Sequence, residues 1–356
     1  MPDSATLLAQ FQPKQFKVLK AERQVCTARF SPCGKLLTAG GYDGTVRRWN
    51  SENDELAELP SLTGHRGWVQ EVAFAPVGGK MFSADSWGAL QAWNYADGGE
   101  QPAWSLPAAH DGWIHALAAN ADGTLAATCG LDRAIRVWSA AEGTMLHEIP
   151  RQPDSLHCLV FHPGGALLAG DLKGIVRQWD LASGQAVRQF DAGVLFKEDR
   201  LQQIGGIRCL AVSDDGAWLA VGGTKPANGG NVQGIPCVLL FDWASGELKH
   251  TLDLGGSGDV YATDIRFHPA GFLMLSTSGG PGIGRLVYRV PTEEKPFFET
   301  TAMPNCHSLS VHPGGLRLAV CGTNAGSQAN GRNLDANGQY ADNHSPIYLL
   351  DMPVPA

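Results

Sequence analysis

The chain has 356 residues, of which 44% are hydrophobic and 17% charged, and its net charge is −8 at pH 7. Together with 44 Gly and 21 Pro, this composition predicts a globular protein with many turns. The acidic balance and the lack of any run of five or more Lys and Arg argue against direct binding to nucleic acid.

The N-terminal segment, MPDSATLLAQFQPKQF, has no basic region followed by an apolar stretch of the kind that directs export. No stretch approaches the ~18 apolar residues needed to cross a membrane, so we expect a soluble protein without a membrane partner. The eight cysteines are spread singly, without a C-x-x-C pair, and most fall inside apolar runs. They predict buried thiols in a reducing compartment, which we expect to be the cytoplasm, and the sequence indicates no cofactor.

One short apolar alternation, which ends in a tight turn and resumes in a second apolar run, occurs seven times along the chain. The alternation has the period of two that predicts a β-strand. The last residues of these first runs are 44, 45, 42, 51, 55 and 44 apart, a spacing typical of four-stranded propeller blades. The first runs are Val25–Phe30, Val69–Phe74, Ile114–Ala119, Leu156–Phe161, Ile207–Val212, Ala262–Phe267 and Cys306–Val311.

The turns after the first runs, such as Ser31-Pro32-Cys33-Gly34, predict hairpins, and a third strand follows in each unit. No segment shows a sustained apolar period of 3.6 residues, so we expect helices to be nearly absent. Three of the turns have a His before Pro, which places these residues on one face, and we interpret them as structural. They are His162, His268 and His312.

Two units carry a recognisable frame, in which Gly64-His65 leads to Trp93-Asn94 and Ala109-His110 leads to Trp138-Ser139. This frame resembles the Gly-His to Trp-Asp frame of WD repeats, and the resemblance covers about residues 14–352. The His-Pro-Gly-Gly turns look more like those of bacterial members of the family than of eukaryotic ones. The resemblance implies an all-β fold, a seven-bladed β-propeller with four-stranded antiparallel blades.

We expect residues 1–356 to form a single domain. Seven blades need 28 strands, yet the last third strand, Ile347–Asp351, is followed only by Met-Pro-Val-Pro-Ala. In the WD family an N-terminal segment supplies the missing outer strand, and residues 14–20 are expected to close the ring here. The blades are expected at about 22–62, 63–106, 107–150, 151–191, 205–253, 258–300 and 304–352.

The resemblance also implies a buried hydrogen-bonded tetrad of His, Ser or Thr, Asp and Trp in each complete blade. By spacing, only blade 3 keeps all four, as His110, Thr128, Asp132 and Trp138. Blade 2 has Trp87 where the Asp would be. We interpret the His110 and Asp132 pair as structural and not catalytic.

In WD propellers the loops between second and third strands and those between blades emerge on one face, the top face. The long loops of this chain belong to those classes, and we expect them to mark a binding surface over blades 5 to 7. They are Asp191–Gly206, Thr224–Pro236, Gly279–Gly284 and Thr323–Ser345.

Aromatic, imidazole and guanidinium groups gather at the expected mouth of the central channel, where the first strands begin. Such groups form hot spots in interfaces. We therefore expect a non-catalytic scaffold, monomeric on its own, that binds a partner protein or peptide on the top face. The predicted contact residues are Trp68, Gln70, Trp113, His115, His157, Arg208, Tyr261, His307, Tyr42 and Trp87.

The same mouth supports an alternative hypothesis of a different class. His115, His157 and His307 would face one channel, where three imidazoles bind a transition metal and leave a position open. The protein would then be a metal-dependent enzyme or a small-ligand binder. No carboxylate stands at an equivalent position to complete the set, and no Ser-His-Asp order or G-x-S-x-G motif supports hydrolysis.

Overall fold

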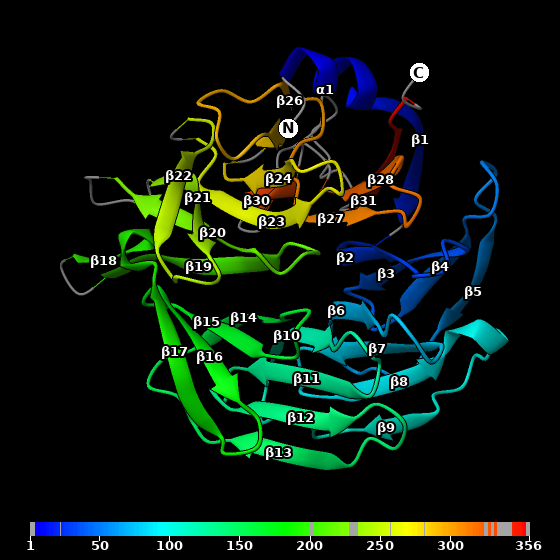
Figure 1. Ribbon diagram of the computed structural model, residues 1–356. Coiled ribbons are helices and arrows are strands. Elements are labelled where there is room, and N and C mark those ends of the chain that lie inside the picture. Colours follow the sequence, from blue (N-terminus) through cyan, green and yellow to red (C-terminus); the bar gives the residue numbers. More distant parts are fainter. Residues whose placement is uncertain are drawn as a thin grey trace.

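The computed structural model describes residues 4–21, 23–199, 202–227, 234–256, 258–280, 282–323, 327–328, 331–332 and 344–353. These residues form an all-β ring of seven antiparallel blades, each with its first strand toward the centre (Figure 1). The expectation of a seven-bladed β-propeller is confirmed.

The first three blades each contain four strands that follow one another along the chain. Blade 1 consists of β2 (Val25–Phe30), β3 (Leu36–Gly41), β4 (Val46–Asn50) and β5 (Glu58–Leu62). Blade 2 consists of β6 (Val69–Phe74), β7 (Lys80–Asp85), β8 (Leu90–Asn94) and β9 (Trp104–Leu106), with a 3-10 helix, η1 (Tyr95–Asp97), after β8. Blade 3 consists of β10 (Ile114–Ala119), β11 (Leu125–Gly130), β12 (Ile135–Ser139) and β13 (Met145–Ile149).

Blades 4 to 6 follow the same order, with one addition in blade 5. Blade 4 consists of β14 (Leu156–Phe161), β15 (Leu167–Asp171), β16 (Ile175–Asp180) and β17 (Gln185–Asp191). Blade 5 consists of β18 (Phe196–Asp199), β19 (Gln202–Val212), β20 (Trp218–Pro226), β21 (Gly234–Asp242) and β22 (Leu248–Asp253), and the 3-10 helix η2 (Gly193–Leu195) precedes it. Blade 6 consists of β23 (Tyr261–Phe267), β24 (Leu273–Ser278), β25 (Gly284–Arg289) and β26 (Phe298–Thr300).

Both ends of the chain build blade 7, which joins β27 (Ser308–Val311), β28 (Arg317–Cys321) and β31 (Ser345–Asp351) to the N-terminal β1 (Lys14–Ala21). Strand β1 pairs with β31 from Lys14 opposite Asp351 to Ala21 opposite Ser345. The N-terminal strand therefore closes the ring, as the sequence predicts. A small hairpin of β29 (Ser327–Gln328) and β30 (Gly331–Arg332) belongs to the expected loop 323–345, most of which lies outside the described residues.

Blade 5 departs from the prediction of four strands, because β18 pairs with the start of β19 and makes its sheet five-stranded. The prediction of a loop over Thr224–Pro236 is also wrong at both ends, where the chain is in strands β20 and β21. Strands β20 and β21 remain paired as far as Pro226 opposite Gly234, because their backbone groups continue to satisfy one another beyond the body of the blade.

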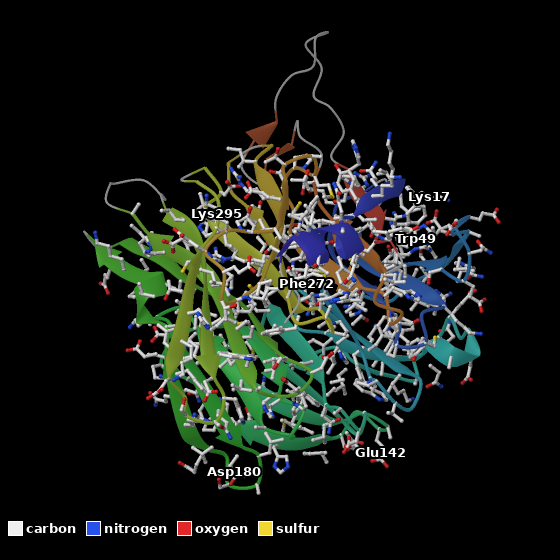
Figure 2. The ribbon with its side chains drawn as sticks, turned by 45° about the horizontal axis from the view of Figure 1, so that its top comes forward. Lys17, Trp49, Glu142, Asp180, Phe272 and Lys295 are labelled. Atoms are coloured by element: carbon white, nitrogen blue, oxygen red, sulfur yellow. The ribbon has the colours of Figure 1, made fainter. Side chains whose placement is uncertain are left out.

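A short helix, α1 (Ser4–Phe11), was not predicted from the sequence either. Its Leu7 and Phe11 are four residues apart, so they share one face, and both are buried. Phe11 packs 5.3 Å from Phe272 of blade 6, measured between ring centroids. Figure 2 shows Phe272 inside the molecule beside this helix, whereas Asp180 and Glu142 lie at its outer edge. Tertiary contact therefore stabilises a helix that is too short to be stable alone.

Seven apolar clusters among the described residues hold the blades together, and each one combines two neighbouring blades. Between blades 1 and 2, for example, Val46 and Leu62 pack with Val69, Met81 and Trp93. Each strand buries one side against the preceding blade and its other side against the following blade. This alternation makes the ring a rigid frame.

The three histidines predicted to be structural join consecutive blades on the face opposite the channel mouth. His162 Nε2 donates to the carbonyl oxygen of Gly216 at 2.9 Å, and its Nδ1 accepts from the Gly164 amide. His268 and His312 make equivalent contacts to Gly315 and Gly34. Each therefore fixes its own turn and links it to the turn of the next blade, from blade 7 to blade 1 in the last case.

Candidate functional site at the channel mouth

A β-bulge recurs at the start of the first strand in six blades and defines the channel mouth. The pairing register with the second strand shifts by one residue there, which leaves one residue of the first strand unpaired and re-aims its side chain. The bulged residues are Cys26, Gln70, His115, His157, Arg208 and Thr263. Four of them, Gln70, His115, His157 and Arg208, are among the residues that the sequence placed at the mouth.

Aromatic side chains form a row on the top face over blades 1 to 3, where they precede first strands or occupy the turn after the second strand. Tyr42 and Trp68 stack with ring centroids 4.6 Å apart, and Trp113 lies 5.7 Å from Trp68. All three are more than a third exposed. We call Tyr42, Trp68 and Trp113 the aromatic row.

Two exposed apolar residues extend this surface. Trp87, 65% exposed, and Leu131, 54% exposed, occupy the turns between second and third strands of blades 2 and 3. A Cβ on Gly67 would come within 3.0 Å of Trp87, and one on Gly112 would approach Leu131, so glycines allow both side chains to pack beside the row. The largest exposed rings thus gather over blades 1 to 3, whereas the sequence placed the long loops over blades 5 to 7.

The row continues into the channel through two imidazoles. His115 lies 5.8 Å from Trp113, and His157 stacks on His115 at 4.5 Å between centroids. The next bulged residue, Arg208, lies over the Tyr261 ring at 5.0 Å. Desolvation, the His115 charge and the Arg208 charge lower the pKa of His157 to about 3.

His307 does not join the other two histidines, although the sequence suggested one three-imidazole set. Its Nδ1 and Nε2 lie 3.0 and 2.9 Å from the carbonyl oxygens of Asn305 and Val25, so the one N–H of the neutral ring donates to the backbone in either tautomer. Within the described part of the chain, no group of three His, Cys, Asp or Glu side chains is arranged to hold a metal ion. The structure thus brings His115 and His157 together and directs His307 to blade 1.

The channel also contains an ion cluster that was not predicted from the sequence. Arg29 lies 2.9 Å from Glu71 and 3.5 Å from Asp264, and Arg266 lies 3.1 Å from Asp264. Burial alone would lower the pKa of Arg29, but the two carboxylates raise it. Charged residues inside otherwise apolar first strands were the available signal. The channel that these residues line has a volume of about 560 Å³.

The tetrad of blade 3 has the expected partners. His110 Nδ1 lies 2.9 Å from Asp132, His110 Nε2 lies 2.7 Å from Thr128 Oγ1, and the Trp138 indole donates to the same oxygen at 2.8 Å. These groups are occupied by one another and lie outside the channel lining. The interpretation as a structural network fits this geometry.

Blade 2 corrects the prediction that only blade 3 keeps four members. Asp85, not the position of Trp87, supplies the carboxylate, 3.0 Å from His65 Nδ1. Ser83 Oγ lies 2.6 Å from His65 Nε2 and accepts from the Trp93 indole at 2.9 Å. The acid stands two residues earlier than in blade 3, because a side chain from either position of the turn can reach the same imidazole.

Seven blades closed by an N-terminal strand, with networks of His, Ser or Thr, Asp and Trp, define the class of the WD-repeat β-propeller. The family model described as "WD domain, G-beta repeat" matches residues 13–50, 101–139 and 143–180. The chain therefore carries WD40 repeats. The first match begins with β1, so the family repeat starts on the outer strand of one blade and continues into the next.

Curated relatives share part of the chain. The Apoptotic protease-activating factor 1 of Rattus norvegicus is 24% identical over 205 residues, which are 57% of this chain and 16% of that protein. The Small ribosomal subunit protein RACK1y of Oryza sativa subsp. japonica is 29% identical over 164 residues, 45% of this chain and 46% of that protein. The Ribosome biogenesis protein WDR12 homolog of Chlamydomonas reinhardtii is 26% identical over 308 residues, 72% and 66% respectively.

The chain thus spans between 16% and 66% of the length of these relatives. All three come from eukaryotes, so they give no support to the resemblance to bacterial members. None of the described helices has the length and apolar character needed to span a membrane.

Proposed function

We propose that this protein is a non-catalytic scaffold that binds a partner protein or peptide on its top face, over the aromatic row and the channel mouth. The observation that carries the proposal is the exposure of Tyr42, Trp68 and Trp113 as one stacked series. Large rings that remain exposed side by side on a soluble ring mark an interaction surface, because burying them against a partner is favourable.

The frame beneath these rings supports a binding role. The Trp68 amide donates to Ser86 Oγ at 2.9 Å, and the Trp113 carbonyl accepts from the Leu131 amide at 2.8 Å. The backbone that presents the rings is therefore tied to the neighbouring turn before any partner arrives. Such preorganisation reduces the entropy that binding would otherwise lose.

A protein partner fits the charge of the molecule better than a nucleic acid does. The net charge is −8, and the exposed residues of the row are aromatic instead of basic. A protein surface that binds nucleic acid needs several Lys and Arg residues to neutralise the phosphates. The histidine and acid pairs of blades 2 and 3 are engaged in their own networks, which supports a role without catalysis.

The test is the double substitution Trp68→Ala with Trp113→Ala in the full chain, expressed with an affinity tag in the native host. We expect the amount of each wild-type partner recovered with this variant to fall at least about tenfold in quantitative mass spectrometry, because hot-spot aromatics each contribute about 2 kcal/mol or more. Circular dichroism and thermal unfolding would check the fold. The proposal would be contradicted if a folded double variant kept every partner.

The matched control removes exposed apolar side chains elsewhere. Val187 on β17 and Leu248 on β22 are 56% and 44% exposed on outer strands. The double substitution Val187→Ala with Leu248→Ala should leave the set of partners unchanged. A loss of the same partners in this control would show that general surface hydrophobicity, and not the row, is responsible.

A further inference from the structure

Three polar side chains occupy equivalent positions of consecutive blades at the channel mouth. His115, His157 and Arg208 are the bulged residues of blades 3, 4 and 5, and all three line the channel. The stacked imidazoles lie next to each other, and the ring of Tyr261 lies beneath the guanidinium of Arg208. We call His115, His157 and Arg208 the mouth cluster.

The hydrogen-bonding groups of the mouth cluster have no protein partner among the described residues. No hydrogen bond is made by either imidazole, and no carboxylate lies within ion-pair distance of Arg208 in the described chain. The same strand position is occupied differently in the next blades. Thr263 donates to the Cys306 carbonyl at 2.9 Å, and both nitrogens of His307 face carbonyl oxygens.

The mouth cluster has one fixed positive charge and two neutral donors. Desolvation lowers the pKa of His115 and of His157, so both imidazoles are neutral at pH 7. Each neutral ring still has one N–H to donate, and a guanidinium presents a planar fork of N–H groups that suits a carboxylate or a phosphate. The other two arginines of the channel, Arg29 and Arg266, are already paired with acids.

We propose that the mouth cluster binds an anionic side chain of the partner, a carboxylate or a phosphate, while neighbouring apolar side chains of the partner cover the aromatic row. This inference rests on the proposed function and adds the chemistry of the partner to it. The row leads to the cluster through Trp113 and His115, so one short peptide can reach both. A buried anion that receives N–H groups from Arg208 and the imidazoles is paired and hydrogen-bonded, which is the condition for burying charge at low cost.

The experiment begins with a phage-displayed library of short random peptides, selected in parallel on the full wild-type chain and on the Arg208→Glu variant. We expect the wild type to enrich peptides that place Asp or Glu near an aromatic or aliphatic residue. Arg208→Glu should lose that enrichment, because it replaces the cation with a like charge. Equal acidic content in both selections would overturn the inference.

Affinities of one selected peptide then locate the contact. The peptide with Glu should bind the Arg208→Ala variant about tenfold more weakly than it binds the wild type, as expected for a hydrogen-bonded charge. The same peptide with Gln in place of Glu should bind the two proteins with nearly equal affinity. Arg208→Lys should retain part of the affinity. Arg188 is the matched control, because it also lies over aromatic rings, Phe190 and Trp243, but on the outside of the ring. Arg188→Ala should not change binding.

A third peptide with phosphoserine in place of Glu distinguishes the two sources of the anion. Tighter binding than the Glu peptide, lost in Arg208→Ala, assigns phosphate, and weaker binding assigns carboxylate. Unchanged affinity of the Glu peptide for Arg208→Ala would overturn the anion site while leaving the proposed function in place. Unchanged binding of all peptides to the variant lacking Trp68 and Trp113, or recovery of no peptide, would instead contradict the proposed function and with it the inference.

Discussion

The two halves of the channel use the same strand positions in opposite ways. In blades 6, 7, 1 and 2 the residues of the first strands below the mouth carry charge or hydroxyl groups that bond across the channel, and we call this the closed half. Its members include Arg29, Glu71, Asp264, Arg266 and Ser308. In blades 3 to 5, the open half, the equivalent residues are small and apolar. They are Ala116, Ala118, Cys158, Val160 and Cys209.

The propeller fold therefore fixes where a side chain points, but it does not determine whether that side chain is free to bind a ligand. The bulge directs Thr263 and Arg208 to corresponding places, yet Thr263 is bound to the neighbouring blade and Arg208 is not. Polar residues deeper in the closed half hold the ring together. Their absence from the open half leaves the polar groups at its mouth available for a ligand.

The largest effect is expected from breaking the closed half. Asp264 accepts a hydrogen bond from the Leu309 amide at 2.9 Å and contacts the guanidinium groups of Arg29 and Arg266. Asp264→Asn would leave two partly buried arginines with Glu71 as their remaining carboxylate. Removing one member of a buried ion cluster typically costs about 3 kcal/mol, so we expect the free energy of unfolding in urea to fall by about that amount.

The control for this prediction is Asp214→Asn, which removes an exposed carboxylate that also lines the channel. Its effect should stay below about 0.5 kcal/mol, as for most surface substitutions. Equal stability losses in the two variants would show that the ion cluster of the closed half does not stabilise the ring.

The imidazoles of the open half make stability depend on pH. The folded state lowers the pKa of His157 to about 3, chiefly by desolvation, whereas a histidine in the unfolded chain titrates near pH 6.5. Between these values the unfolded state binds a proton that the folded state does not. The free energy of unfolding should therefore decrease as the pH falls from about 6.5 toward 3.

His157→Asn should remove up to about 1.4 kcal/mol per pH unit from that slope near pH 5, the value for one proton. Urea unfolding at several pH values would measure the slope. Gln70→Ala is the matched control, because Gln70 is the bulged residue of blade 2 and has no ionisable group. An identical slope in wild type and His157→Asn would refute the assignment.

Local alternation was sufficient to predict the seven first strands and the closing strand, because each strand buries one side against a neighbouring blade. The helix α1 was not predictable in this way, since its stability comes from contacts of Leu7 and Phe11 with blades more than 250 residues away in sequence. The role of Asp85 was also hidden. Spacing within a repeat gives a position along the chain, but two positions of one turn can bring a carboxylate to the same imidazole.

The residues of the mouth were predictable, but their availability was not. His115 and His307 occupy corresponding positions in the repeat, and no sequence feature separates them. His307 is occupied because the Val25 carbonyl of the adjacent blade lies 2.9 Å from its ring, a contact that depends on closure of the ring. The division into a closed and an open half is thus a property of the assembled propeller.

The smallest effect concerns a buried polar group without a hydrogen-bond partner in blade 4, which belongs to the open half. The Trp179 indole N–H is buried and has no acceptor within the described structure, because Ala169 stands ten residues before it. In blades 2 and 3 the same spacing places Ser83 and Thr128 as acceptors for Trp93 and Trp138. The strand register is also the same, with the Trp opposite the residue two before the hydroxyl position.

Ala169→Ser should therefore raise the free energy of unfolding by about 1 kcal/mol, the usual net contribution of a hydrogen bond. The same substitution in a Trp179→Phe background should instead lower it, because the buried hydroxyl would then lack the indole donor. Urea unfolding of the four proteins forms a double-mutant cycle that isolates the pair. A coupling near zero would mean that blade 4 cannot bring the two groups within hydrogen-bond distance, and that its lost polar contact is not a matter of one missing hydroxyl.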